Sequence, residues 1–419
     1  MAEAPIVSSK LYDCAALLLL AAFSLTWPAY ASPQFWTNAF MQHDILGIDS
    51  IAYYTSVLND ISGMAYERRP LFGFIAASLK SAYVVLFGME SGDAAAAVFR
   101  TFGLLPPLLT YGLARFHLAI GASFALALFC STSLVVMFNH VAYDSYGLTM
   151  AVGIAALIAT TAYYRWLPDP VSRQPVIAAA VTIGVTLIAG WIAVSLLSIV
   201  LLFLIPALAK LPRSWRTSVW GGLVCGAIGI GFIIPSLLKP WVNDVQGAMA
   251  SRYFVPHNLI SIDAWANRLV ADCVAALAYP GDVLSGSRFP GIANVEDWMA
   301  PVRAQALSNP WVLLLGGFFL GLMAMSWKAV RQAGEFGHRI LAIWLALALS
   351  TVFFVIWSPG EAMLFSGCMW PFQIALAIVG RAQVGPRRGW IVDLALIVFA
   401  ALMFFNNLDV LNQTAGNYD

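Results

Sequence analysis

The segment PLFGFIAASLKSAYVVLFG, residues 70–88, decides the topology of the chain, because it is long enough to look like a membrane span. A spanning helix needs about 20 mainly apolar residues. Lys80 lies in the middle of the segment, and Arg68 and Arg69 directly precede it. A central lysine is costly in hydrocarbon. We therefore predict a helix that lies along a membrane surface, or dips into it, without crossing.

The composition of the whole chain excludes an ordinary soluble domain. Of its 419 residues, 61% are hydrophobic and only 10% are charged, and the mean hydropathy is +0.80. The net charge of +1 provides no basic field for nucleic acid, so we expect no such partner. The five cysteines lack CxxC spacing and indicate neither a disulfide framework nor a metal cluster. The chain is predicted to be an all-α polytopic membrane protein.

Apolar stretches of spanning length recur along the chain. We predict about eleven transmembrane helices, at 11–31, 93–114, 118–137, 147–166, 175–190, 191–208, 217–237, 311–327, 340–357, 362–380 and 390–405. They form a single domain over residues 1–419.

The distribution of Lys and Arg orients these spans. If residues 70–88 do not cross and the N-terminus is cytoplasmic, the short connections that carry Lys and Arg are all cytoplasmic, as the positive-inside rule requires. Three segments then lie on the outer face: a first loop with juxtamembrane helices at 32–92, a short loop at 139–147 and a long loop at 238–310.

The first outer loop contains the stretch MQHDILGIDSIAYY, residues 41–54. Asp49 precedes a helical pattern, so it is either a helix N-cap or a catalytic carboxylate. Asp44 lies across Gly47, and a turn there would let both carboxylates face one pocket. Tyr53, one helical turn after Asp49, would shape that pocket.

The second outer loop, NHVAYDSYG at 139–147, places His140, Tyr143 and Asp144 directly after a predicted span. With His43, the residues His140 and Asp144 could bind a divalent cation such as zinc, manganese or magnesium, because imidazole and carboxylate suit these metals. The alternative is that Asp144 caps the helix that begins at Tyr146. Arg100, one turn into a predicted span, is expected to form an ion pair with Asp93 or another acid.

The order of several motifs resembles the GT-C superfamily of integral-membrane glycosyltransferases, which includes aminoarabinose and mannosyl transferases. These motifs are DSIAYY, ERRPLFGF, LFG, VFRTFGLLPPLLTYGLARF and the later SPGEAMLFSGCMWPFQIAL. The resemblance implies a GT-C fold whose first extracytoplasmic loop carries the catalytic Asp, at the position of Asp49. It also implies that Asp144 and Glu361 help to frame the substrate pocket. Members of the family differ on whether a metal is used.

The expected reaction moves a sugar in one inverting displacement from a polyprenyl-phosphate donor to a hydroxyl of a glycan, lipid or protein. A carboxylate takes the acceptor proton, and cations hold the departing phosphate. The best phosphate ligands are Arg68 with Arg69, and Arg252 with His257, because a lipid phosphate lies at interface depth.

We therefore expect a bacterial inner-membrane enzyme with a cytoplasmic N-terminus, a periplasmic site and surrounding membrane lipids as partners. An O-antigen-type polymerase or ligase would depend on Arg252, His257 and Arg288 of the long loop instead. A secondary transporter would place more polar residues at the bilayer midplane.

Overall fold

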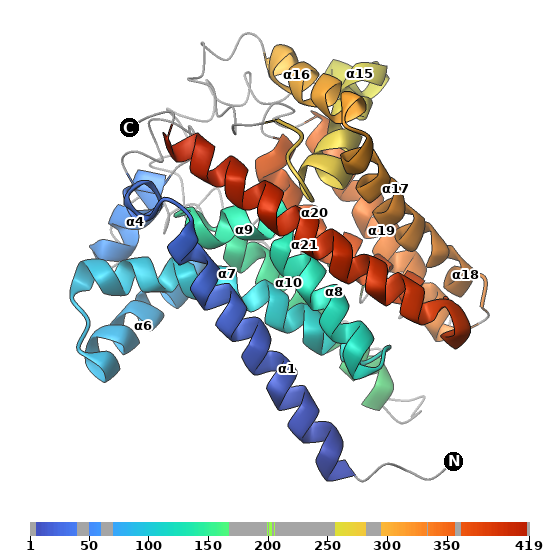
Figure 1. Cartoon of the computed structure of the whole chain (residues 1–419), viewed down its shortest axis with the longest axis horizontal. Helices are drawn as coiled ribbons and strands as arrows, with labels where there is room; N and C mark the ends of the chain where they lie inside the picture. The colour runs from blue at the N-terminus through green and yellow to red at the C-terminus, as the bar shows by residue number, and fades with distance from the viewer. Residues whose placement is uncertain are drawn as a thin grey trace, which may run out of the picture.

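The computed structural model describes residues 6–39, 50–59, 70–166, 199, 201–202, 205, 256–281, 295–332, 334–356 and 362–416. These residues form helices and connecting turns, with no strand among them (Figure 1). The N-terminal half contains α1 (Ile6–Thr26), η1 (Trp27–Tyr30), α2 (Pro33–Trp36), α4 (Ser50–Leu58), α6 (Pro70–Phe87), α7 (Ser91–Arg115), α8 (Ile120–Thr132), α9 (Leu134–Val141) and α10 (Tyr146–Trp166). The C-terminal half contains η3 (Pro256–Ile260), α15 (Ile262–Val270), η4 (Ala271–Ala275), α16 (Val295–Ser308), α17 (Pro310–Met325), α18 (Trp327–Val330), α19 (Glu335–Ile356), α20 (Ala362–Ala382) and α21 (Pro386–Gly416).

Four stretches of the described chain are long and apolar enough to cross a membrane, or five if the bent pair α8–α9 counts as one span. They are Lys10–Tyr30, Pro310–Val330, Phe336–Val355 and Arg387–Gly416. The prediction of an all-α membrane protein is confirmed for the described residues. The number of about eleven spans stays a prediction, and the spans expected at 175–190, 191–208 and 217–237 lie almost wholly outside the described residues.

Helix α20 is the centre of the bundle and packs against α10, α17 and α19. Every residue from Ser366 to Arg381 is buried, as expected for a helix that is apolar on all sides. Gly380 permits the closest approach, because a Cβ atom there would overlap the carbonyl oxygen of Leu322 on α17. The core of the protein therefore surrounds α20.

The span predicted at 118–137 is wrong as a straight helix, because α8 and α9 meet at a bend of 60°. Ser133 between them has an extended backbone, with φ −65° and ψ 143°. The amides of Leu134 and Val135 donate to the carbonyls of Leu277 and Ala276, each at 2.9 Å. Distant carbonyls thus replace the helical acceptors that the break removes, as an apolar environment requires.

The fully buried Asn407 of α21 completes this junction. Its Nδ2 donates to the carbonyls of Thr132 at 2.9 Å and Leu277 at 2.8 Å, and its Oδ1 accepts from the amide of Tyr279 at 3.3 Å. One amide side chain therefore joins α8, the 276–279 segment and α21.

Part of the predicted long outer loop packs into the core, while the bounds of the loop and its side of the membrane stay a prediction. Residues 271–279 are all buried. This stretch, ADCVAALAY, is rich in alanine, so its backbone approaches neighbouring helices closely. A Cβ atom at Gly316 of α17 would lie 2.9 Å from Val274 and 3.1 Å from the carbonyl oxygen of Cys273.

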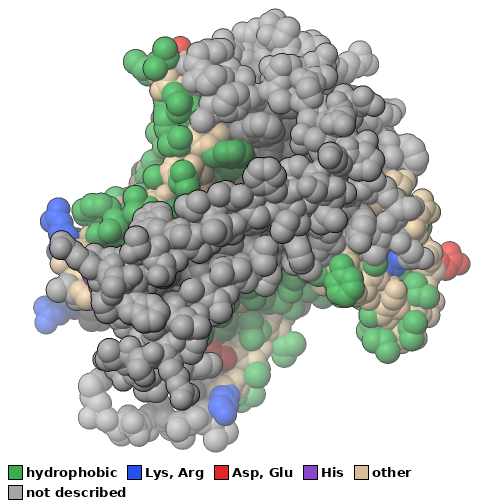
Figure 2. Space-filling model, turned by 180° about the vertical axis from the view of Figure 1, so that it is seen from behind, with side chains coloured by type: hydrophobic (Ala, Val, Ile, Leu, Met, Phe, Trp, Pro, Cys, Tyr) green, Lys and Arg blue, Asp and Glu red, His purple; other side chains and the backbone are tan. Residues whose placement is uncertain are grey.

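Helix α6 covers the segment that decides the topology, and it packs beside α4 and α7 (Figure 1). Lys80 is buried, and its Nζ donates to the carbonyl oxygen of Leu58 at 2.6 Å. Leu58 is the last residue of α4, and the carbonyls at a helix C-terminus attract a cation. The described side chains visible in Figure 2 are mainly apolar, with Lys and Arg at the edges of the view.

Candidate functional site

Arg100 of α7 joins the first and the second of the predicted outer loops. Its Nη1 donates to the carbonyl oxygen of His140 at 2.9 Å, and its Nη2 donates to that of Trp36 at 3.2 Å. The expected ion pair with Asp93 is therefore wrong, since backbone carbonyls are the partners of this guanidinium. One side chain of α7 thus binds a carbonyl at the end of α2 and a carbonyl in the last turn of α9.

Tyr143 makes a second connection between the loops. Its hydroxyl donates to the carbonyl oxygen of Thr37 at 3.2 Å, and its ring lies 5.0 Å from that of Tyr54 and 5.3 Å from that of Phe99 between centroids. Burial raises the pKa of Tyr143 to about 12, although the charge of Arg100 opposes the shift. The phenol therefore stays protonated and can donate at any pH near neutrality.

The backbone at His140 lies directly against α7. A Cβ atom added at Gly103 would overlap the Cα atom of His140. The imidazole of His140 packs edge-on against Trp27, with ring centroids 5.5 Å apart. The position of the second loop thus depends on a glycine in α7.

We expect Gly103→Ala to lower the free energy of unfolding by about 1–3 kcal/mol, because backbone cannot move aside as a flexible side chain can. Gly112→Ala is the matched control on the same helix. Its Cβ atom would meet only Ile158 Cδ1, at 3.7 Å, so the gain in helix propensity should stabilise α7 slightly. Denaturant unfolding in detergent micelles measures both, and equal effects of the two substitutions would contradict the close approach.

Asp144 lies at the start of α10, which begins at Tyr146 as predicted. The side chain is 4% exposed. Its Oδ1 accepts from the amide of Ser145 at 2.5 Å and from the hydroxyl of Ser145 at 3.1 Å. The carboxylate therefore stabilises the turn between α9 and α10 that contains Tyr143.

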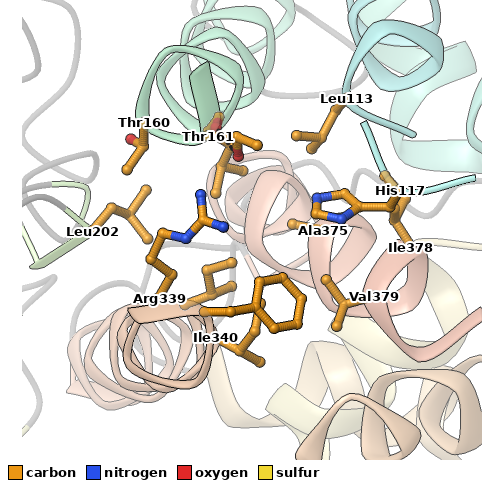
Figure 3. Close-up of a pocket in the computed structure, with 13 residues that line it drawn as sticks. Leu113, His117, Thr160, Thr161, Leu202, Arg339, Ile340, Ala375, Ile378 and Val379 are labelled. Carbon is orange, nitrogen blue, oxygen red and sulfur yellow. Dashed lines mark hydrogen bonds between the residues drawn. The ribbon is translucent and has the colours of Figure 1, made fainter. Parts of the chain in front are cut away.

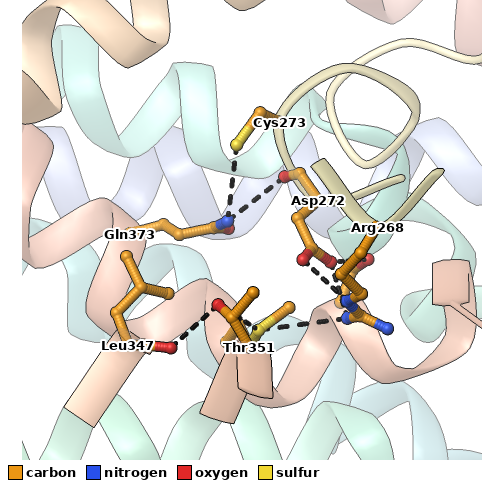
Figure 4. Close-up of polar contacts among 8 residues, drawn as sticks. Arg268, Asp272, Cys273, Leu347, Thr351 and Gln373 are labelled. Carbon is orange, nitrogen blue, oxygen red and sulfur yellow. Dashed lines mark hydrogen bonds and ion pairs between the residues drawn. The ribbon is translucent and has the colours of Figure 1, made fainter. Parts of the chain in front are cut away.

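A buried ion pair joins Arg268 of α15 to Asp272 of η4 (Figure 4). Arg268 donates two hydrogen bonds to the carboxylate of Asp272, from Nε at 2.7 Å and from Nη2 at 2.6 Å. The Ser366 hydroxyl donates to Asp272 Oδ1 at 2.8 Å, and Gln373 Nε2 donates to the Asp272 carbonyl at 3.3 Å. The guanidinium also lies over the Phe354 ring, 5.1 Å from its centroid. The pair therefore fastens α15 and η4 to α19 and α20.

The first turns of α20 connect the ion pair to the second loop. Ser366 binds Asp272, and a Cβ atom at the next residue, Gly367, would lie 3.4 Å from Tyr146 Cβ and 3.7 Å from Asn139 Nδ2. The 139–146 turn, α4 and the N-terminal part of α20 therefore meet at one end of the bundle.

Several predicted site residues lie outside the described residues. They are Asp44, Asp49, His43, Arg68, Arg69, Arg252 and Glu361, together with the side chain of His257, whose backbone lies in η3. Asp49 immediately precedes α4, and Glu361 immediately precedes α20. Within the described ranges, no three His, Cys, Asp or Glu side chains are grouped so that they could hold a metal ion.

The structure also shows residues that sequence reasoning missed. Tyr54 makes the ring contact with Tyr143. Tyr53 instead packs in the apolar cluster between α4, α6 and α7, with its ring centroid 5.4 Å from that of Phe72. Arg268 and Asp272 are four residues apart, the spacing at which opposite charges meet on a helix. That spacing was visible in the sequence and was the available signal for the buried pair.

No protein-family model and no curated protein matches the chain. Among solved structures, the chain is similar to archaeal oligosaccharyltransferase AglB from Archaeoglobus fulgidus, solved in complex with an inhibitory peptide and a dolichol-phosphate. The sequence identity is 14% and the TM-score is 0.48, and the match covers 98% of this chain and 56% of AglB. The chain thus spans little more than half the length of that protein.

Proposed function

We propose that the chain is an inverting glycosyltransferase of the GT-C type. It moves a sugar from a polyprenyl-phosphate donor to a hydroxyl of a glycolipid, polysaccharide or protein. The site faces the periplasm in a bacterial inner membrane, and the N-terminus is cytoplasmic. The order of the sequence motifs supports the reaction class, and the distribution of Lys and Arg supports the orientation.

The observation that carries this proposal is the contact between α4 and the second outer loop. Tyr54 lies against Tyr143, and Asp49 is the residue directly before α4. The two segments in which the sequence places acidic site residues therefore meet, although Asp49 and Asp144 are far apart in the chain. Such convergence is what a shared acceptor pocket requires.

In the proposed reaction, Asp49 accepts the proton of the acceptor hydroxyl as its oxygen attacks the anomeric carbon, while the bond to the donor phosphate breaks. Asp44 supports this carboxylate, and Tyr54, Tyr143, Asp144 and Glu361 frame the pocket. Arg68, Arg69, Arg252 and His257 stabilise the departing lipid phosphate.

We assign no step to a divalent metal. His43, His140 and Asp144 stay candidate ligands of such a metal, and within the described residues no group of three ligating side chains is formed.

Transfer of radiolabelled sugar tests the proposal directly. Membranes that contain the protein are incubated with a panel of polyprenyl-phosphate sugars, beside membranes that lack it. The expected result is protein-dependent transfer from one donor that requires Asp49. Activity that requires Arg252, His257 and Arg288 but not Asp49 would instead identify a polymerase or ligase, and no transfer from any donor would overturn the reaction class.

A further inference from the structure

Helix α15 exposes apolar side chains and buries its cation. Ile260, the last residue of η3, and Ile262, the first residue of α15, are 89% and 86% exposed, more than any other large apolar side chain among the described residues. Leu269, two turns further along α15, is 54% exposed, whereas Arg268 is buried. A helix that faces water has the opposite arrangement. The surroundings of this face are therefore expected to be apolar.

The exposed apolar residues of α15 lie on one face of the helix. Their spacing is that of an amphipathic helix, and the face consists of Ile262, Trp265, Ala266 and Leu269. The indole N–H of Trp265 donates to the carbonyl oxygen of Leu259 at 3.0 Å, so it is satisfied within the segment itself. Tryptophan is enriched at membrane interfaces, where its ring meets apolar chains. We call this face the apolar stripe of α15.

Contacts with the protein fix the rotation of α15. Asp263, beside the apolar stripe, forms an ion pair of 2.7 Å with Arg303 of α16. Arg268 binds Asp272, whose carboxylate also accepts from the hydroxyl of Ser366 on α20. The polar residues thus hold α15 to α16, η4 and α20, and the apolar stripe is turned outward.

Contacts with α19 place α15 at the end of a candidate membrane span. Both η3 and α15 pack against α19. Asn258 Nδ2 donates to the carbonyl oxygen of Val355 at 3.2 Å, and the guanidinium of Arg268 lies over the Phe354 ring. Val355 is the last residue of the candidate span Phe336–Val355. The apolar stripe therefore lies at the depth where this span leaves the hydrocarbon.

The opposite end of α19 gives a second measure of this depth. Figure 3 shows Arg339, near the start of α19, in a pocket between α7, α10, α19 and α20. An arginine near the end of a span places its charge at the interface. Val355 follows Arg339 by 16 residues, which corresponds to about 24 Å of helix. Because the hydrocarbon is about 30 Å thick, this length is close to that of one crossing.

Exposed apolar side chains of the neighbouring helices adjoin the stripe. They are Leu307 of α16, Leu313 and Leu314 of α17, and Leu349, Val352 and Phe353 of α19. Helix α16 packs against both α15 and α17. Apolar side chains also dominate the described surface at the upper left of Figure 2. The lipid that surrounds the candidate spans α17 and α19 can therefore extend over α15.

We propose that α15, together with Ile260, is an interfacial anchor that inserts its apolar stripe into the boundary between lipid head groups and acyl chains. The partner is the lipid surface, and apolar contact provides the attraction, since Asp263 beside the stripe is paired with a cation. Through Arg268, Asp272 and Ser366, the anchor sets the depth of the first turns of α20 in the membrane. The anchor does not depend on the transfer reaction, so each proposal can fail without the other.

Fluorescence quenching in nanodiscs that hold one copy of the full chain tests the anchor. Ile262→Cys and Asp263→Cys each provide a thiol for bimane, which is attached in detergent before reconstitution. The quenchers are phosphatidylcholine brominated on its acyl chains and aqueous iodide. We expect bromine to quench bimane at position 262, and iodide to quench it at least about threefold less than at 263, because an interfacial helix buries its apolar face about 5–10 Å into the boundary.

The two positions are matched controls, because they are adjacent and the native side chains are similarly exposed, 86% and 79%. Wild-type protein treated in the same way gives the signal of the native cysteines, and Ile260→Cys repeats the test if Ile262→Cys does not fold. Strong iodide quenching at both positions without bromine quenching would overturn the proposal, since the stripe would face water. Protection of position 262 from both quenchers would also overturn it, since another protein surface would then cover the stripe.

Discussion

Asp49→Asn is expected to reduce sugar transfer by about 10²–10⁴-fold, the range over which a positioned general base contributes to a rate. Asparagine has nearly the same shape as aspartate and is as good a helix N-cap. It cannot take the proton of the acceptor hydroxyl. The substitution therefore separates the two interpretations of this carboxylate, because a capping residue would keep both stability and activity.

The measurement is the initial rate of transfer in membranes at matched protein levels, together with the unfolding midpoint in detergent. Asp263→Asn is the control, because the Asp263 side chain is 79% exposed and forms a surface ion pair with Arg303. We expect it to leave the rate within about twofold, as surface pairs contribute little. If Asp49→Asn is as active as wild type and equally stable, Asp49 is only a cap, and the proposed reaction loses its base.

Arg268→Met is expected to lower the free energy of unfolding by about 3–5 kcal/mol, because it leaves the carboxylate of Asp272 buried without its cation. The side chains of the pair are 2% and 5% exposed, so water cannot replace the lost partner. Among the described residues, only the hydroxyl of Ser366 would still donate a hydrogen bond to that carboxylate. The large effect follows from the stranded charge and not from the strength of the pair itself.

Denaturant unfolding in micelles measures this effect, with Arg303→Met as the control. Arg303 forms an ion pair of similar length with Asp263, 2.7 Å, but at the surface, and its loss should cost at most about 1 kcal/mol. The double variant Arg268→Met with Asp272→Leu should recover most of the lost stability, since an apolar pair of similar size replaces a buried ion pair well. Equal costs for the two single Arg variants would show that burial does not distinguish the pairs.

The sequence alone predicted the helices that depend on local residue patterns. The helix beginning at Tyr146 follows directly from hydropathy and turn residues, as do most of the long apolar helices. The helix at 70–87 was also predicted. The carbonyl of Leu58 at the end of α4, which accepts the hydrogen bond from Lys80, was not.

The features that sequence reasoning missed depend on contacts between distant segments. The bend after Thr132 is possible because carbonyls of residues 276 and 277 replace the lost helical acceptors, and nothing near Ser133 encodes them. Arg100 was expected to form an ion pair with an acid, but its guanidinium donates instead to two backbone carbonyls, those of Trp36 and His140. Similarly, Tyr53 and Tyr54 are adjacent, and only the packing of α4 determines which of them contacts Tyr143.

The junction at Asn407 has a consequence for biosynthesis. The bent pair α8–α9 emerges from the ribosome long before the segment at 276–279, and α21 is translated after both. Until those parts arrive, the backbone groups at Thr132, Leu134 and Val135 lack the partners that they have in the finished bundle, and hydrocarbon offers no substitute. This junction can therefore form only after α21 has been made, so the backbone at the bend is completed late in synthesis.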